Sequence, residues 1–142
     1  MISAATALAV TFNLVCTGTT ETTIGNSTTV SDHTVTFRID LARERFCQGE
    51  CVTERPIADV QPSILVLEER RVDDIMLIIR YRNAIDRWTG RQTIVEQHQR
   101  RRVSASALSR RTDARCEVSA FTGMPGTPPT ADSAAGGVPR RR

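Results

Sequence analysis

The stretch Thr34-Val-Thr-Phe-Arg-Ile-Asp-Leu41 alternates polar and apolar side chains without interruption. Its four apolar residues occupy the odd positions from 35 to 41, so in an extended chain they share one face. This alternation is typical of a strand with one buried and one solvated face. It predicts an all-β or β-dominated domain, either a small antiparallel sandwich or a partly closed barrel of about six to eight strands.

The same alternation occurs earlier in the chain, where Val10, Phe12, Leu14 and Cys16 share one parity. A strand over these residues would turn Cys16 toward the core. Residues 17–32 lie between the two alternating stretches and are dense in Thr, Ser and Gly. They are too polar to bury, and we expect a long hairpin loop or a pair of edge strands.

Several shorter stretches after residue 55 also indicate strands and turns. The near-continuous apolar run 75–81 suits a central strand covered on both faces, with a short buried helix as the alternative. Gly90 is expected in the turn of a hairpin formed by 85–88 and 91–95. The remaining predictions are a strand over 63–67, a turn at Asp73-Asp74, a strand or helical turn over 103–108 and a weak strand over 114–121.

The composition favours one small domain over residues 10–121. The chain has 142 residues, of which 39% are hydrophobic and 4% aromatic, so its core must be small and mainly aliphatic. Residues 122–142 are rich in Gly, Pro, Ala and Arg, and we expect a disordered tail. No run approaches the roughly 18 apolar residues that span a bilayer.

Residues 1–9 resemble a shortened signal peptide that ends in the cleavage-type pattern Ala7-Leu8-Ala9. They predict a periplasmic or secreted protein. If residues 1–9 instead begin the first strand or a short helix, the protein is cytoplasmic and its four cysteines are thiols.

The four cysteines are Cys16, Cys47, Cys51 and Cys116, which allow three disulfide pairings. The pairing Cys47–Cys51 with Cys16–Cys116 is favoured. Cys47 and Cys51 are close in sequence around Gly49, and the other two lie in the first and last expected strands. A bridge between Cys16 and Cys116 closes a loop of roughly 100 residues, which is worth on the order of 4–5 kcal/mol. A zinc site at Cys47 and Cys51, completed by His33 or His98, is the disfavoured alternative.

No assembled catalytic site or cofactor motif is evident. The two histidines, His33 and His98, lie in no recognised triad, and the carboxylate pairs at 68–69 and 73–74 suit a solvated turn. We therefore expect no catalytic residue, cofactor or metal. A hydrolase that uses Asp40, Asp86 or His33 is kept as an alternative.

The charge pattern indicates a solvated surface. The net charge is +3, and all nineteen basic residues are Arg, spread along the chain and often beside acids. Clusters occur at 100–102, 110–111 and 140–142, without interleaved aromatic residues. Nucleic-acid binding is not expected, although an Arg-mediated RNA or anionic-surface binder is kept as an alternative. A monomer is expected, and no partner is identified.

A series of short motifs resembles small uncharacterised exported proteins of sphingomonad-type alphaproteobacteria. The motifs are Val15-Cys-Thr-Gly18, Phe37-Arg-Ile-Asp-Leu41 running into Arg45-Phe-Cys47, Ile85-Asp-Arg-Trp-Thr-Gly90, Arg115-Cys-Glu117 and Phe121-Thr-Gly-Met-Pro125. The resemblance covers about residues 10–125 and implies a secreted or periplasmic β domain. It carries over no activity and no catalytic residue, and we expect a non-enzymatic protein that binds a ligand or a protein partner. The chain departs from the pattern in its short N-terminal segment and in its Arg/Pro tail.

Overall fold

A computed structural model of the protein describes residues 10–101 and 103–125. These residues form nine antiparallel strands in one sheet and contain no helix, hence none that is long and apolar enough to cross a membrane. The strands are β1 (Thr11–Ile24), β2 (Ser27–Asp40), β3 (Arg45–Gln48), β4 (Arg55–Pro56), β5 (Asp59–Val60), β6 (Ile64–Asp73), β7 (Leu77–Asp86), β8 (Arg91–Arg100) and β9 (Val103–Ser119). The all-β prediction is confirmed, with more strands than expected because the short β4 and β5 also pair.

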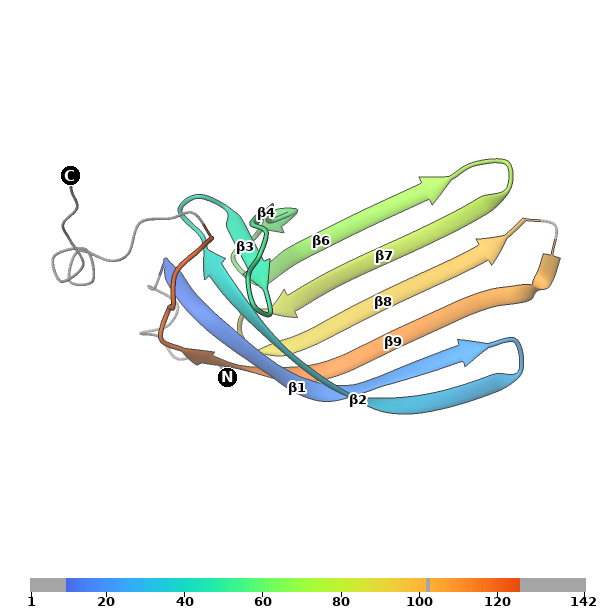
Figure 1. Ribbon diagram of the computed structural model, residues 1–142, viewed down its shortest axis with the longest axis horizontal. Coiled ribbons are helices and arrows are strands. Elements are labelled where there is room, and N and C mark those ends of the chain that lie inside the picture. The colour runs from blue at the N-terminus through green and yellow to red at the C-terminus, as the bar shows by residue number, and fades with distance from the viewer. Residues whose placement is uncertain (1–9, 102, 126–142) are drawn as a thin grey trace, which may run out of the picture.

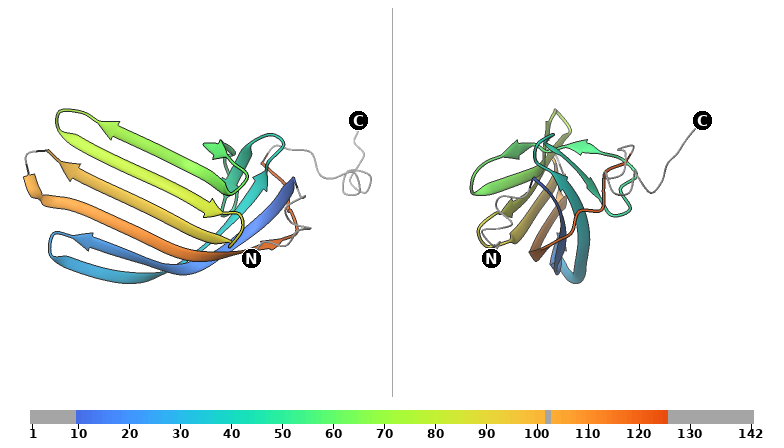
Figure 2. Two further views of the ribbon diagram at one scale, coloured as in Figure 1. Left: turned by 180° about the vertical axis from the view of Figure 1, so that it is seen from behind. Right: turned by 90° about the vertical axis from the view of Figure 1, so that its left-hand side faces the viewer.

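The sheet is curled into a half-barrel with the strand order β4-β3-β2-β1-β9-β8-β7-β6-β5 (Figure 1). The chain makes hairpins β1–β2, β6–β7 and β8–β9, whose turns gather at one end of the molecule, here called the distal end. The end-on view in Figure 2 shows the curl, with β3 and β4 folded toward β6. Of the two predicted architectures, the partly closed barrel is therefore the one formed.

The core fills the inner face at the opposite, proximal end. Phe37 and Ile39 are buried there as their alternation predicts, and they pack with Leu14 and the Cys16–Cys116 pair. The seam between the two ends of the sheet is bridged at this level, because Arg55 of β4 binds Glu68 of β6 at 2.9 Å. The proximal end is therefore the stable part of the fold.

Toward the distal end the sheet continues as a single layer. Ile75 and Met76 lie in the β6–β7 turn and are 83% and 65% exposed, while Leu77 to Ile79 are half-buried. The prediction of a strand covered on both faces over 75–81 is therefore wrong for this part of the chain. The apolar run is extended as expected, but no described segment packs over it.

The polar stretches form more regular structure than their composition suggests. Residues 17–32 lie in the two 14-residue strands β1 and β2, joined by a turn at Gly25-Asn26. The expectation of two strands is confirmed, but only β2 is an edge, because β1 also pairs with β9. Residues 97–100 belong to β8, although their sequence is polar and basic. Both stretches are held by main-chain pairing, which does not depend on apolar side chains.

The first four residues of the expected tail are packed against the sheet. Met124 is buried against Cys47 and Cys51, and Arg38 donates to the carbonyl of Gly123. The side chain of Asn13 also donates to Thr122. The ordered domain thus extends to Pro125, beyond the boundary expected at residue 121. The segment expected to be a signal peptide and the rest of the tail lie outside the described residues.

Candidate functional site

The two disulfides pair the cysteines as the sequence favoured. Cys16 and Cys116 face each other directly across β1 and β9, with Cα atoms 3.9 Å apart. Cys116 donates its N–H to Gly90 on the other side, so the cysteine pair is a non-hydrogen-bonded pair of the β1–β9 ladder. Side chains approach most closely at such pairs. The Cys47–Cys51 disulfide clips the turn after β3.

The zinc alternative is contradicted by these disulfides. Both sulfur atoms that would bind the metal are joined to each other, so neither Cys47 nor Cys51 is available as a thiolate. No group of three or more metal-ligating side chains occurs among residues 10–101 and 103–125.

A buried polar row crosses the inner face beside the core. Nε2 of His33 lies 3.1 Å from Oε1 of Gln92, and Nε2 of Gln92 donates to Oδ1 of Asn83 at 3.0 Å. Gln92 is 0% exposed, and its amide is satisfied by these two neighbours. The row therefore has a structural role, with Gln92 as the side-chain partner of His33.

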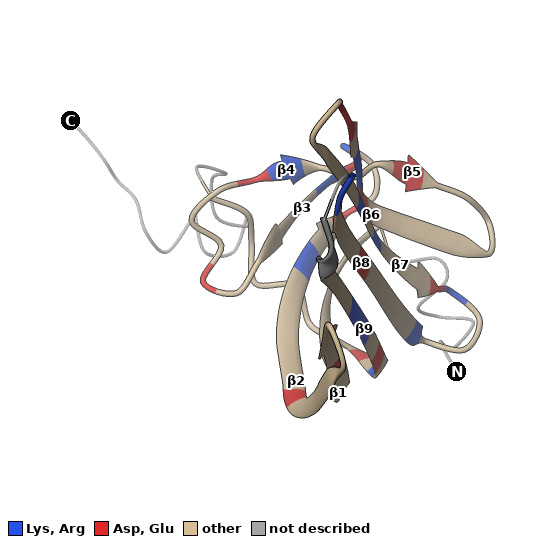
Figure 3. Ribbon diagram, turned by 90° about the vertical axis from the view of Figure 1, so that its right-hand side faces the viewer, with Lys and Arg blue, Asp and Glu red and all other residues tan. Residues whose placement is uncertain are grey.

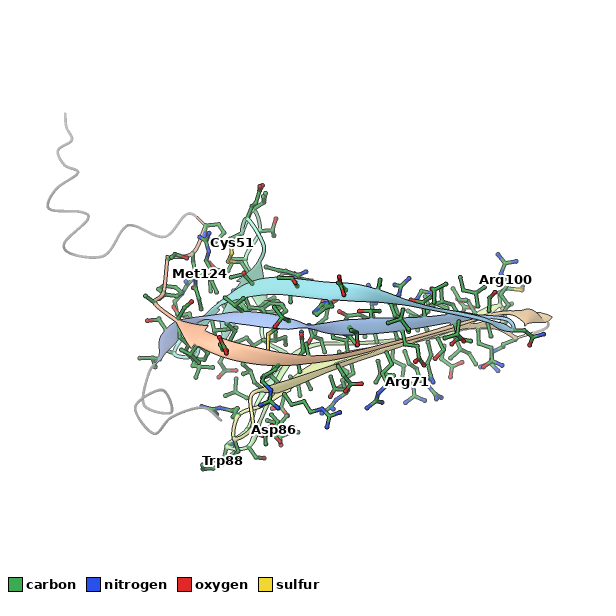
Figure 4. The ribbon with its side chains drawn as sticks, turned by 90° about the horizontal axis from the view of Figure 1, so that it is seen from below. Cys51, Arg71, Asp86, Trp88, Arg100 and Met124 are labelled. Carbon is green, nitrogen blue, oxygen red and sulfur yellow. A yellow bond between two sulfur atoms is a disulfide. The ribbon has the colours of Figure 1, made fainter. Side chains whose placement is uncertain are left out.

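The three residues of the hydrolase alternative do not form one site. Asp40 and His33 are seven residues apart on β2, which corresponds to about 23 Å along an extended strand. Asp86 is the last residue of β7 (Figure 4), and its carboxylate accepts the N–H groups of Trp88 and Thr89 in the β7–β8 turn. These hydrogen bonds lower the pKa of Asp86, and the bond from the Thr89 N–H has the larger effect. They hold the Asp86 carboxylate as an anion that caps the turn.

The carboxylate pairs likewise have local partners. Glu68 binds Arg55 at 2.9 Å, and Asp73 forms an ion pair with Arg101. Asp74 accepts the N–H groups of Met76 and Leu77, which lower its pKa. Residues 73–74 thus lie at the β6–β7 turn as expected, whereas Glu68 and Glu69 lie within β6, where they pair with Arg55 and Arg82.

The outer face of β6, β7 and β8 carries a concentration of positive charge. Arg71 and Arg80 are directly opposed across β6 and β7, and Arg82 lies two residues further along β7. With Glu69, Arg70 and Tyr81 they line a hollow of about 500 Å³ over Thr93, Val95 and Gln97, here called the arginine hollow. Figure 4 shows Arg71 on the side of the sheet opposite to Arg100, away from the inner face.

The charges of the arginine hollow are not balanced locally. Arg82 binds Glu69 at 3.3 Å, but no carboxylate among the described residues forms an ion pair with Arg71 or Arg80. Guanidinium groups stay protonated at any physiological pH, and like charges directly opposed on a sheet are destabilising. The opposed pair therefore costs stability unless an anion lies between its members.

Sequence reasoning missed the arginine hollow because its arginines come from two strands. In the clusters that it identified, Arg101 is paired with Asp73, Arg110 with Glu96 and Arg111 with Asp113, whereas Arg100 forms no ion pair with a described residue. A usable signal was present, since Arg80 and Arg82 share a parity and Asp73-Asp74 marks a turn. The register of the β6–β7 hairpin, which sets Arg71 against Arg80, was the missing information.

The chain matches no protein-family model, no curated protein and no solved structure.

Proposed function

We propose that the protein is an exported, non-enzymatic binding protein that holds an anion with two or more charged groups in the arginine hollow. The opposed pair Arg71–Arg80 is the observation that carries this proposal. Two guanidinium groups on one face can each bind a phosphate, sulfate or carboxylate group through a forked pair of N–H donors. A ligand with two such groups would remove the repulsion between the arginines.

Export is supported by the four cysteines, all of which are in disulfides. Disulfides persist in oxidising compartments and are rare in the cytosol. Mass spectrometry of the protein from its native host, with and without reductant, tests this part. A shortened N-terminus and a four-proton mass difference on reduction are expected, and an intact N-terminus with four free thiols would contradict export.

The RNA-binding alternative has less support than a small anion. Single-stranded nucleic acid is held by a basic groove together with aromatic side chains on which bases stack. Tyr81 is one of the residues that line the arginine hollow, but its place in the ladder sets its side chain on the face of Asn83 and Glu96, opposite to that of Arg80. The Trp88 side chain projects from the β7–β8 turn at the other end of these strands (Figure 4).

Calorimetric titration at low salt tests the arginine hollow, with inorganic tripolyphosphate as the probe and orthophosphate and citrate as comparisons. Tripolyphosphate is expected to bind more tightly than orthophosphate, because it spans both arginines. Arg71→Gln and Arg80→Gln should each weaken binding by roughly tenfold or more, since each removes charge-assisted hydrogen bonds. If citrate binds more tightly than tripolyphosphate, the arginine hollow is specific for carboxylate rather than phosphate groups.

The matched control is Arg43→Gln. Arg43 lies in the β2–β3 turn and is already paired with Glu54, so this variant removes the same charge outside the arginine hollow. It should leave tripolyphosphate binding unchanged apart from the small effect of net charge. Equal losses in all three variants would show nonspecific attraction to a basic protein and would overturn the proposal. Absence of tripolyphosphate and citrate binding in the parent protein would do the same.

A further inference from the structure

The outer edge of β2 is unpaired over much of its length. β3 pairs with β2 only at residues 37–40, and Gly49 donates to the carbonyl of Thr36 just before that segment. From there to the turn at Gly25-Asn26, no other described strand lies beside β2. Figure 1 shows this part of β2 as the lower border of the sheet.

The direction of the free main-chain groups on this edge follows from the ladder. The N–H and C=O groups of successive residues point alternately to the two sides of an antiparallel strand. Because the carbonyl of Thr36 points away from β1, the same is true of Thr34, Asp32, Val30 and Thr28. These four residues present one N–H and one C=O each, eight groups in all.

The two long edges of the half-barrel are protected to different degrees. The distal part of β6 reads Glu68-Glu-Arg-Arg-Val-Asp73, and charged side chains are a common protection of an edge strand. Residues 27–36 of β2 carry Asp32 as their single acidic residue and no Arg or Pro, and Val30 is 65% exposed. In Figure 3 the same contrast is visible, since β2 is tan over most of the length below its basic segment. Such an edge is a template for another strand.

We propose that two copies of the chain pair through this edge of β2, antiparallel and about a twofold axis at Ser31. This register sets residues 28, 30, 32 and 34 against residues 34, 32, 30 and 28 of the second copy, so that all eight free groups find partners. A twofold axis one residue away, at Val30 or Asp32, leaves some of them unpaired. The axis at Asp32 also sets two carboxylates against each other, which is unfavourable.

The side chains agree with the axis at Ser31. Thr28 lies opposite Thr34 of the second copy, a β-branched pair that is favourable between strands. Val30 lies opposite Asp32, so no like charges meet. The second copy is favoured over an unrelated strand because one sequence supplies both sides of the match. The expectation of a monomer took no account of this edge.

Analytical ultracentrifugation over a range of concentrations tests the dimer, with variants that change the charge at the paired positions. Val30→Asp should weaken association by about tenfold, because each introduced carboxylate lies opposite Asp32 of the other copy. Adding Asp32→Lys to Val30→Asp should restore association, since both pairs become attractive. Met76→Asp is the matched control, because Met76 is also 65% exposed but lies in the β6–β7 turn; it should have no effect.

Cysteine cross-linking then tests the register. Ser31→Cys places two thiols at a non-hydrogen-bonded pair with Cα atoms about 4.5 Å apart, within the reach of a disulfide. Thr29→Cys places them four residues out of register, about 13 Å apart along the strand and beyond that reach. A cross-linked dimer for the first variant only, with native disulfides intact by peptide mapping, is expected.

Three results would overturn the proposal. The first is a parent protein that sediments as a monomer at every concentration. The second is a dimer that Val30→Asp leaves unchanged, which would place the contact on another surface or with another register. The third is cross-linking of Thr29→Cys as efficient as that of Ser31→Cys.

Discussion

Nε2 of His33 lies 3.1 Å from Oε1 of Gln92, although β1 and β9 separate β2 from β8 in the sheet. In a flat sheet three strand spacings would set their main chains about 14 Å apart. The intervening positions in this row are Gly18 and Ala114. The small residues and the curl of the sheet together allow the two long side chains to meet over the core.

Gly18→Ala is expected to destabilise the protein by about 1–3 kcal/mol, because an added Cβ overpacks a close contact between strands. A Cβ at this position would lie 2.0 Å from the carbonyl oxygen of Asp113 and 2.5 Å from Cα of Ala114. The measurement is urea unfolding, with the exposed Thr19→Ala on the same strand as control. Equal stability of Gly18→Ala and the parent would show that the curl does not depend on this contact.

The two disulfides should contribute unequally to stability. Replacing both Cys16 and Cys116 by Ala should cost about 4–5 kcal/mol, because their bridge closes a 100-residue loop. The same change at Cys47 and Cys51 should cost only about 2 kcal/mol, because their loop is short. Denaturant unfolding of the two double variants gives the comparison, and the reverse order would contradict the loop-length explanation.

Met124→Ala should destabilise the domain by about 2 kcal/mol, since it removes a buried side chain from the outer face. Thermal unfolding measures the effect. The exposed Val52→Ala, near the same disulfide, is the control and should change little. If Met124→Ala is as stable as the parent, residues 122–125 do not stabilise the domain and belong to the tail.

Two turn carboxylates should make the protein less stable in acid. Main-chain N–H groups hold the pKa of Asp74 and Asp86 below the value of 3.8 for a free carboxyl. Since the folded pKa is the lower one, the stabilisation is complete above the unfolded pKa and is lost as the pH falls through the folded one. Melting temperatures between about pH 5 and pH 2 should therefore fall less for Asp74→Asn with Asp86→Asn than for the parent. If the melting temperatures of the two proteins fall in parallel with pH, these carboxylates do not contribute to the acid sensitivity of the fold.

Arg80→Thr should raise the stability of the unliganded protein by about 0.2–1 kcal/mol, because it removes the repulsion with Arg71. The same variant should bind tripolyphosphate more weakly than the parent. Urea unfolding without and with tripolyphosphate measures both effects. Arg82→Thr, which removes an arginine already paired with Glu69, should not be stabilising. A destabilised Arg80→Thr would show that the opposed arginines are not in conflict.

Much of the fold could be predicted because it depends on local alternation. The parity of residues 35–41 and of Cys16 was sufficient to assign their buried face, and Gly90 was correctly expected in a turn, where its φ is 76°. The polar stretches 17–32 and 97–100 could not be assigned to long strands with the same security. Their pairing is a main-chain property of the neighbouring strands, and composition does not report it.

The candidate site was less predictable than the fold. Arg71 and Arg80 are nine positions apart along the chain, in a region where arginines recur beside acids. Whether a given arginine meets a carboxylate or another arginine depends on which residues are opposed across two strands. A shift by one residue would turn Arg80 to the other face.

The sequence by itself therefore determined the class of the fold, the buried parity of its clearest strands and the favoured pairing of its cysteines. These features follow from the two-residue period of a strand and from the number and spacing of four cysteines. The tertiary structure alone decided the curl at Gly18, the packing of Met124, the opposed arginines and the open edge of β2. Each of these depends on contacts between residues far apart in the chain, which are set by strand order and register.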